Sequence, residues 1–376
     1  MRNSGNSRCL LVASFIASLV LTGCGQQESS VADEDLDQGG EQASQSDNNV
    51  PSEEQDAAAE AGTPSGADSS TEKASTPESD QHDTVRQWLT QLVGEEASAR
   101  EAARAELNNA AVEDEVLLKL MKDPSAPVRQ GAIYYLTGRF VIQDTALQAA
   151  FLGALEDEDG KVRELALQMV ARMPVQTVQP AIGQLVRMLD AGAEEERNRA
   201  TVARFLGRLK IEWQLVLPAL IKSVKEDPSV SVRKASLFGV SRIALPKEAV
   251  PVYRHILSED KDVSVRRAAA LHLGRLGPEA AAACAELGIA LTAEDDELSD
   301  TAAAALTRIG SKAVPELIEQ VSSSVPRARR LAIYSLGVLG APAKSAIPAL
   351  KQCLKDPDPE VRQLAEMALR SLLFVP

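Results

Sequence analysis

From Asp83 to its last residue, the chain repeats one pattern of small, apolar and polar positions. The stretch Asp260–Gly277, DKDVSVRRAAALHLGRLG, shows the unit that recurs, in which an acidic turn is followed by Val265-Arg266 and a run of small residues. When Arg266 is counted as position zero, small residues recur at +3 and apolar residues recur at +7 and +10. This spacing places one buried stripe along an α-helix.

The positions equivalent to Arg266 recur at intervals of 30 to 36 residues. They are Arg129, Arg163, Arg199, Arg233, Ser299, Arg329 and Arg362. A period in this range indicates a solenoid, in which each repeat is a helical hairpin that packs on its neighbours. In several repeats an Asp stands six residues before the Arg, as Asp260 does before Arg266. We expect this Asp to accept N–H groups of the turn and the Arg to reach the turn of the next repeat.

The unit D-P-x-x-x-V-R…A…L-G-x-[LI]-G resembles the short HEAT repeat of the phycobilisome-lyase-like type. The resemblance covers residues 83–376 and implies an all-α, right-handed α-solenoid, a HEAT-like superhelix of about nine stacked hairpins. Trp88, Leu89 and Leu92 lie in residues 83–110, which we expect to form an atypical capping unit at the amino-terminal end.

Residues 1–23 have the pattern of a secretion signal. Arg2 and Arg8 precede the apolar run Cys9–Leu21, which is too short for a comfortable membrane span. The run ends in Leu21-Thr22-Gly23-Cys24, which resembles the lipobox of bacterial lipoproteins. The resemblance implies cleavage before Cys24 and attachment of lipid to its thiol. An ordinary cleaved secretory signal is the alternative. Gly25 rather than Asp follows the Cys, which by the same resemblance favours the outer membrane, facing the periplasm.

Residues 24–82 have the composition of a disordered acidic tether. Fifteen acidic residues stand against the single basic residue Lys73, and large apolar side chains are almost absent. Such a segment buries too little apolar surface to offset the entropy of ordering it. Because the tether alone has a net charge of −14, the predicted folded part, residues 83–376, is close to neutral. A near-neutral, exported body argues against nucleic-acid binding.

Candidate catalytic or metal-binding residues are few. His255 and His272 fall in the two helices of one repeat without HExxH, CxxC or His-Glu companions, and we interpret them as ordinary helix-surface histidines. The missing His-Glu pairs also argue against deoxyhypusine hydroxylase, an iron enzyme built on similar repeats. Cys284 and Cys353 lie two repeats apart and are expected to be buried, unpaired thiols. The sequence therefore predicts no cofactor, no metal and no small-molecule substrate.

One set of positions suggests a binding groove. Arginine occupies +9 in five consecutive repeats, and bulky side chains occupy +5 in several. In HEAT-like folds the second helices line the concave side, so an arginine-striped groove with apolar spots would suit an acidic or extended protein partner. The alternative is that the +9 arginines are only part of the repeat consensus. The predicted groove residues are Arg172, Arg208, Arg242, Arg275, Arg308, Tyr134, Phe238, Leu271 and Tyr334.

The sequence thus favours a membrane-anchored, non-enzymatic scaffold that binds a protein partner along the concave face. An enzyme or enzyme accessory of the HEAT-like lyase type is the alternative, and it rests on the name of the repeat family alone.

Overall fold

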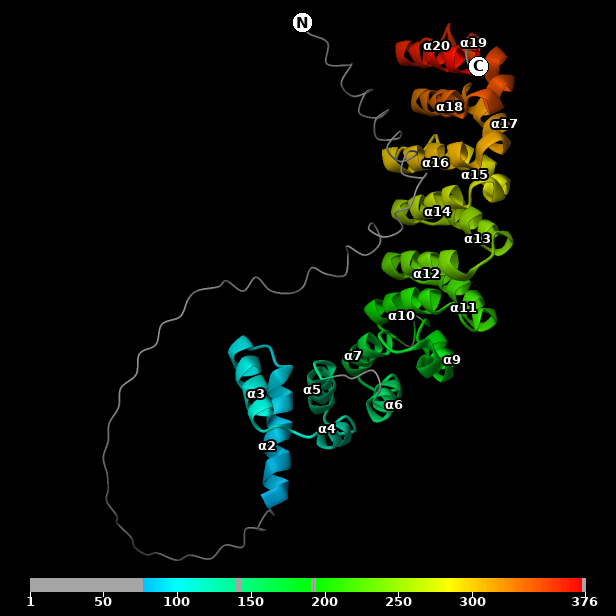
Figure 1. The fold of residues 1–376 in the computed structure, drawn as a ribbon. Coiled ribbons are helices and arrows are strands. Elements are labelled where there is room, and N and C mark those ends of the chain that lie inside the picture. Colours follow the sequence, from blue (N-terminus) through cyan, green and yellow to red (C-terminus); the bar gives the residue numbers. More distant parts are fainter. Residues whose placement is uncertain (1–76, 140–143, 191, 193, 374–376) are drawn as a thin grey trace, which may run out of the picture. The chain divides into compact units, whose positions relative to one another are not determined.

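The computed structural model describes residues 77–139, 144–190, 192 and 194–373. Throughout these residues the chain forms helices, turns and loops, and none of them is in a strand (Figure 1). Contacts divide the chain into Met1–Asp80 and Gln81–Pro376, and only residues 77–80 of the first part are described. The predicted signal, Cys24 and nearly all of the predicted tether lie outside the described residues. Within the described part, no helix has both the length and the apolarity needed to span a bilayer.

The helices of the second part follow one another as hairpins, which confirms the predicted all-α solenoid. Each hairpin has a first helix, often opened or interrupted by a short 3-10 turn, and a second helix that is at least as long. The first helices are α4 (Asp114–Leu120), α6 (Thr145–Ala154), α8 and α9 (Val175–Val178, Ile182–Arg187), α11 (Trp213–Glu226), α13 (Pro246–Glu259), α15 (Cys284–Ala290), α17 (Val314–Gln320) and α19 (Ile347–Cys353). The 3-10 turns are η2 (Gln179–Ala181), η3 (Gly277–Ala283), η4 (Gly310–Ala313) and η5 (Ala341–Ala346).

The second helices stack on one another through the length of the solenoid. They are α5 (Ala126–Thr137), α7 (Gly160–Val170), α10 (Glu196–Leu209), α12 (Val230–Ile243), α14 (Val263–Leu276), α16 (Asp296–Ile309), α18 (Pro326–Leu339) and α20 (Pro359–Leu373). From α10 to α20 they form one layer and the first helices form another, as Figure 1 shows. The core lies between the two layers.

The predicted stripe on the second helices is buried. Every residue at +3 is fully buried, including Ala269 and Ser236, and the residues at +7 are at most 8% exposed, as at Leu369. Position +10 is less uniform, because Ile243 and Leu276 are only half-buried. Positions +3 and +7 are therefore the uniformly buried part of the predicted stripe.

Small residues allow neighbouring second helices to approach closely. A Cβ atom at Gly207 of α10 would lie 2.5 Å from the Cα atom of Gly239 in α12, and one at Gly274 of α14 would lie 3.0 Å from the Cα atom of Ala305 in α16. Both contacts join position +8 of one helix to position +6 of the next. A larger side chain at either glycine would push the two helices apart.

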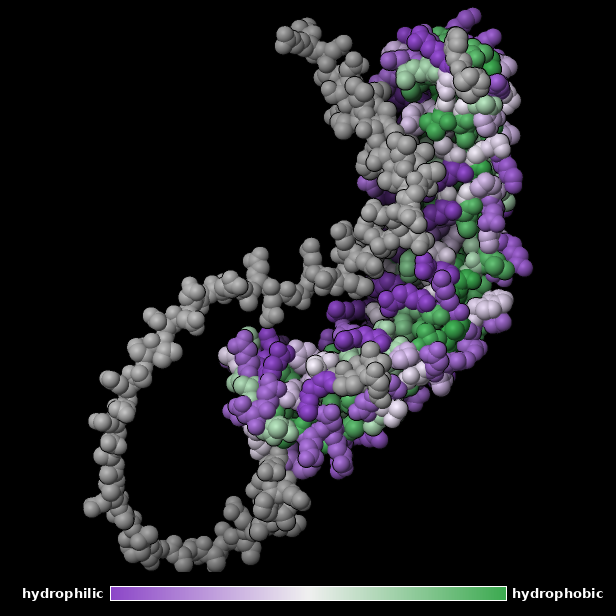
Figure 2. All heavy atoms as spheres, viewed as in Figure 1, coloured by the Kyte–Doolittle hydropathy of each residue, from purple (hydrophilic) through white to green (hydrophobic). Residues whose placement is uncertain are grey.

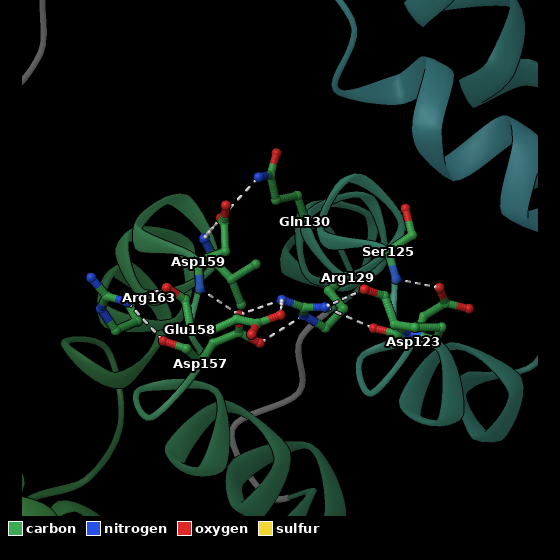
Figure 3. A network of polar contacts seen from close by, with 10 residues as sticks. Asp123, Ser125, Arg129, Gln130, Asp157, Glu158, Asp159 and Arg163 are labelled. Carbon is green, nitrogen blue, oxygen red and sulfur yellow. Dashed lines mark hydrogen bonds and ion pairs between the residues drawn. The ribbon is translucent and has the colours of Figure 1, made fainter.

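A ladder of arginines and carboxylates joins the turns between first and second helices. Arg129 donates from Nε and Nη2 to Asp157 of the next turn at 2.8 and 2.7 Å, and from Nη1 to the carbonyl of Asp123 in its own turn at 2.8 Å (Figure 3). Asp157 also accepts the backbone N–H of Asp159 at 2.9 Å. Arg129 thus satisfies its own turn and the following one, as the sequence predicted for the ladder, and Arg163, Arg199, Arg233 and Arg329 do the same.

Where a repeat departs from the usual Asp and Arg pair of the ladder, a nearby residue forms the ion pair instead. In the repeat of Arg199, where no Asp stands six residues before the Arg, Glu194 forms the ion pair with Arg163 instead. Arg86 of α2 (Pro77–Leu92) begins the ladder by pairing with Asp123 at 3.1 Å. Arg266 has no carboxylate partner among the described residues, and its neighbour Arg267 pairs with Asp295 at 3.1 Å instead. Arg86 was not recognised from the sequence, because α2 precedes the first regular repeat.

The amino-terminal helices depart from the hairpin pattern, as expected of an atypical end unit. Leu89 of α2 is fully buried, and its backbone lies so close to Gly131 of α5 that no side chain would fit there. α3 (Ala97–Asn109) follows α2 and contributes Asn108, whose side-chain oxygen accepts a hydrogen bond from the hydroxyl of Tyr135 at 2.8 Å.

Candidate functional site

We use the name second-helix face for positions −2, +1, +5 and +9 of α7, α10, α12, α14, α16, α18 and α20, most of which are exposed or half-buried. These positions lie away from the buried +3 and +7 stripe. They form three levels along each helix: −2 and +1 are the first level, +5 is the second and +9 is the third. The levels differ in charge, and this difference decides what the face can bind.

The first level, near the start of each helix, contains arginines that are paired with carboxylates. Arg267 of α14 pairs with Asp295 and Glu297, and Arg327 of α18 pairs with Asp300 at 2.7 Å. Arg330 similarly lies beside Glu360 of α20. These ion pairs cross from one second helix to the next or to the turn before it, so the first level is largely neutralised.

The second level, at +5, is a row of apolar and aromatic side chains over the last five second helices. Phe238, Leu271 and Tyr334 were predicted for this row, and the structure leaves all three partly exposed. Ala304 and Met367 complete the row; Met367 is 59% exposed, whereas the small side chain of Ala304 is buried. The sequence reasoning missed these two, although the same +5 count identifies them.

The third level, at +9, contains the predicted arginines. Arg172, Arg208, Arg242 and Arg275 are exposed, and Arg308 is half-buried. Among the described residues, the side chains of Arg172, Arg242 and Arg275 have no hydrogen-bond or ion-pair partner, and Arg208 lies over the ring of Phe205 at 6.0 Å from its centroid. Unlike the arginines of the first level, Arg172, Arg242 and Arg275 therefore have charge available for a partner.

Two of the predicted groove residues, Arg172 and Tyr134, differ from the others in their surroundings. Arg172 lies just beyond the end of α7, in the turn that follows it. Tyr134 of α5 accepts a hydrogen bond from Arg104 of α3 at 2.7 Å, and the same guanidinium lies 5.6 Å from the centre of its ring. Tyr134 is thus in contact with α3, whereas the other +5 residues belong to the row on α12–α20.

An apolar hollow of about 170 Å³ lies between α18 and α20. Tyr334, Val338 and Met367 line it, together with Ile333, Gly337, Leu364, Ala368 and Ser371. Val338 occupies +9, so the arginine row ends here and its place is taken by an apolar side chain that is 43% exposed. Elsewhere on the surface, apolar patches interrupt the polar side chains in the region of α11 and α13 (Figure 2).

The two histidines do not form a site. His272 is only 7% exposed, so our interpretation of it as a surface histidine was wrong, and its ring stacks on Tyr253 at 5.4 Å between centroids. It occupies +6, which faces the preceding second helix, and this position was the signal that sequence reasoning overlooked. His255 is exposed, about 200° around α13 from Tyr253. Burial lowers the pKa of His272 to about 4, with a smaller contribution from Arg275.

Cys284 and Cys353 are buried and unpaired, as predicted. Burial raises the pKa of the Cys284 thiol to about 11, which removes the thiolate needed for reactivity at neutral pH. In the described part of the chain, no group of three or more His, Cys, Asp or Glu side chains has the arrangement needed to hold a metal ion.

Comparisons with known proteins agree with this architecture. Residues 217–287 and 284–370 match the sequence profile of HEAT repeats. The karyopherin Kap121p, in a structure bound to the extreme C-terminus of the protein phosphatase Cdc14p, is similar in fold, with a TM-score of 0.54 at 13% identity. That match covers 79% of this chain and 38% of Kap121p.

Two further structures are similar at lower coverage or lower score. A Kap121p mutant gives a TM-score of 0.53 at 14% identity over 79% of this chain and 37% of that one. The E. coli protein YibA is matched over its whole length and 81% of this chain, with a TM-score of 0.41 at 15% identity. No curated protein matches the chain by sequence.

Proposed function

We propose that this protein is a non-enzymatic scaffold that binds a protein partner along the second-helix face. The observation that carries the proposal is the contrast between two sets of arginines on the same helices. Those at the first level have carboxylate partners, whereas Arg242 and Arg275 at the third level are exposed and have none among the described residues. Unpaired guanidinium groups beside an apolar row suit a protein surface that offers carboxylates and apolar side chains.

The fold supports the same function. A solenoid presents an extended surface built from equivalent positions of successive repeats, and such surfaces commonly bind other proteins. Kap121p, which has a similar fold, is bound in its structure to the end of another protein's chain. The likeness concerns fold, and the partner of this protein follows only from its own surface chemistry.

We further propose that the scaffold is anchored in the cell envelope by lipid on Cys24, with the outer membrane facing the periplasm as its location. The acidic segment that follows Cys24 would then separate the solenoid from the lipid surface. This part of the proposal rests on the lipobox-like sequence and the composition of residues 24–82.

Site-specific crosslinking in intact cells tests the binding surface. A photoreactive amino acid at Leu271, in the middle of the +5 row, should give a discrete adduct, and the same probe at the exposed Lys222 of α11 should not. The adduct at Leu271 should disappear when Arg242 and Arg275 are replaced by Glu. Equal adducts at both positions, or an adduct that is indifferent to the arginine replacements, would contradict the proposal.

The enzyme or enzyme-accessory alternative makes a different prediction. It requires loss of a measurable activity when His255, the exposed histidine, is replaced. Crosslinking at Leu271 with full activity of a His255→Ala strain would favour the scaffold.

A further inference from the structure

We infer that the segment bound by the second-helix face is an acidic polypeptide in extended conformation, with a bulky apolar side chain that enters the hollow between α18 and α20. This inference rests on the proposed function and specifies the chemistry of the partner. It follows from three features: the charge of the arginine row, its spacing, and the apolar hollow at its end.

The charge of the row selects carboxylates. Four positions of the row, Arg172, Arg208, Arg242 and Arg275, are exposed, and the carboxylates of neighbouring second helices are already engaged at the first level. Guanidinium groups form their strongest hydrogen bonds with carboxylate or phosphate oxygens. A partner with several Asp or Glu side chains would therefore complete a set of ion pairs that the chain itself leaves incomplete.

The spacing of the row selects an extended chain. Packed helices lie about 8–10 Å apart, so a partner that crosses them meets one arginine per step of this length. Three residues of polyproline II helix span about 9.3 Å and return to the same side of the chain. Seven residues of α-helix, the comparable repeat on one side, span about 10.5 Å and exceed the step. An extended segment with an acidic residue at every third position therefore matches the row best.

The hollow at the end of the row selects an apolar side chain. Val338 replaces arginine at +9 in α18, and Tyr334, Val338 and Met367 line a hollow of about 170 Å³. A cavity of about 150 Å³ accommodates benzene, so this hollow is the right size for one aromatic or branched side chain. Because the two levels are four residues apart, about 6 Å along the helix, one extended backbone reaches both.

The test uses a fluorescent synthetic peptide and the purified full-length protein. The peptide has Glu at every third position, Pro and Ser between them, and Phe at both ends, so that one Phe reaches the hollow whichever way the peptide runs. A matched peptide contains the same residues with all the Glu side by side. We expect the periodic peptide to bind at least about tenfold more tightly than the matched one, which corresponds to about 1.4 kcal/mol.

Variants of the protein then separate the two parts of the site. Arg242→Glu with Arg275→Glu should weaken binding of the periodic peptide by more than about tenfold, and the uncharged replacement Val338→Gln should remove the contribution of Phe while leaving that of Glu. Arg187→Glu with Lys222→Glu is the matched control, since it makes the same charge change on exposed residues of α9 and α11, and it should bind like the unchanged protein.

Three outcomes would overturn the inference. In the first, the protein binds the periodic and the matched peptide equally tightly. In the second, the control variant loses as much affinity for the periodic peptide as Arg242→Glu with Arg275→Glu does. In the third, the protein binds vesicles rich in phosphatidylglycerol and does not bind the peptide. In each case the crosslinking at Leu271 still reports independently on whether the face binds a protein. A crosslinked adduct without peptide binding would retain the scaffold function and reject this partner chemistry.

Discussion

Arg233 and Asp260 form a two-point ion pair between consecutive repeats, with 2.8 Å from Nε to Oδ2 and 2.9 Å from Nη2 to Oδ1. The Asp260 side chain is only 4% exposed, and Nη1 of Arg233 also donates to the carbonyls of Asp227 and Pro228. The hydrogen bond to Asp260 raises the pKa of Arg233, so the arginine remains charged. One side chain therefore holds two turns in register.

Replacement of Arg233 by Ala should be strongly destabilising. It leaves the carboxylate of Asp260 buried without its counter-ion and two turn carbonyls without their donor. We expect a loss of about 3–5 kcal/mol in the free energy of unfolding. Urea denaturation of the full-length protein measures this loss. A double-mutant cycle with Asp260→Ala should give a coupling of more than about 1 kcal/mol, and additive losses would show that the pair acts as two independent residues.

Replacements at two positions of α14, only two residues apart, test which side of a second helix is buried. Leu273 of α14 is fully buried and Arg275 is exposed. Leu273→Ala should cost about 2–5 kcal/mol because it leaves a cavity in the core. Arg275→Ala should cost less than about 1 kcal/mol, as expected for an exposed charge without an ion-pair partner. Thermal and urea unfolding check both, and similar losses would contradict the assignment of the two faces.

Stability should fall in mild acid because of His272. Its pKa is about 4 in the folded protein, below the ordinary value of 6.5, mainly because of burial. Between these two values the unfolded chain binds a proton that the folded protein does not. The stability is therefore fully present above about pH 6.5 and falls as the pH drops towards 4, by about 3 kcal/mol in total.

The control for this pH dependence is His272→Phe, which keeps a ring to stack on Tyr253 but cannot be protonated. From pH 7 to about pH 4, the free energy of unfolding of the unchanged protein should fall by about 3 kcal/mol more than that of His272→Phe. If the free energies of unfolding of the unchanged protein and of His272→Phe vary with pH in parallel, His272 does not contribute to the pH dependence of stability.

Replacement of Cys24 by Ser should abolish membrane attachment. The lipobox-like sequence predicts lipid on this thiol, and the polar, acidic residues after it offer no other anchor. We expect the Cys24→Ser protein to be released into the soluble fraction or to persist as the uncleaved precursor. Membrane fractionation with a carbonate wash measures this, and retention of the variant in washed membranes would indicate a different anchor.

The repeat period and the buried stripe could be predicted from the sequence because both are local. A helix that must bury one side against its partner needs small or apolar residues at helical spacing, and Ala269 and Leu273 satisfy this in sequence as well as in space. The ladder was also predictable, since Arg and Asp recur together and their separation fits adjacent turns. The boundaries of the signal and the tether remain predictions from the lipobox-like sequence and from composition.

Only the tertiary structure decided which charges are free and which polar side chains are buried. Arg267 and Arg275 lie on the same helix and look alike in the sequence, yet the first pairs with Asp295 of the next turn and the second has no ion-pair partner among the described residues. His272 is buried because +6 faces the preceding second helix, where Ala or Gly stands in several other repeats. Pairing and burial at these positions depend on neighbours about 30 residues away in sequence. The period of the sequence reports that such neighbours exist, and the packed structure determines which of their side chains meet.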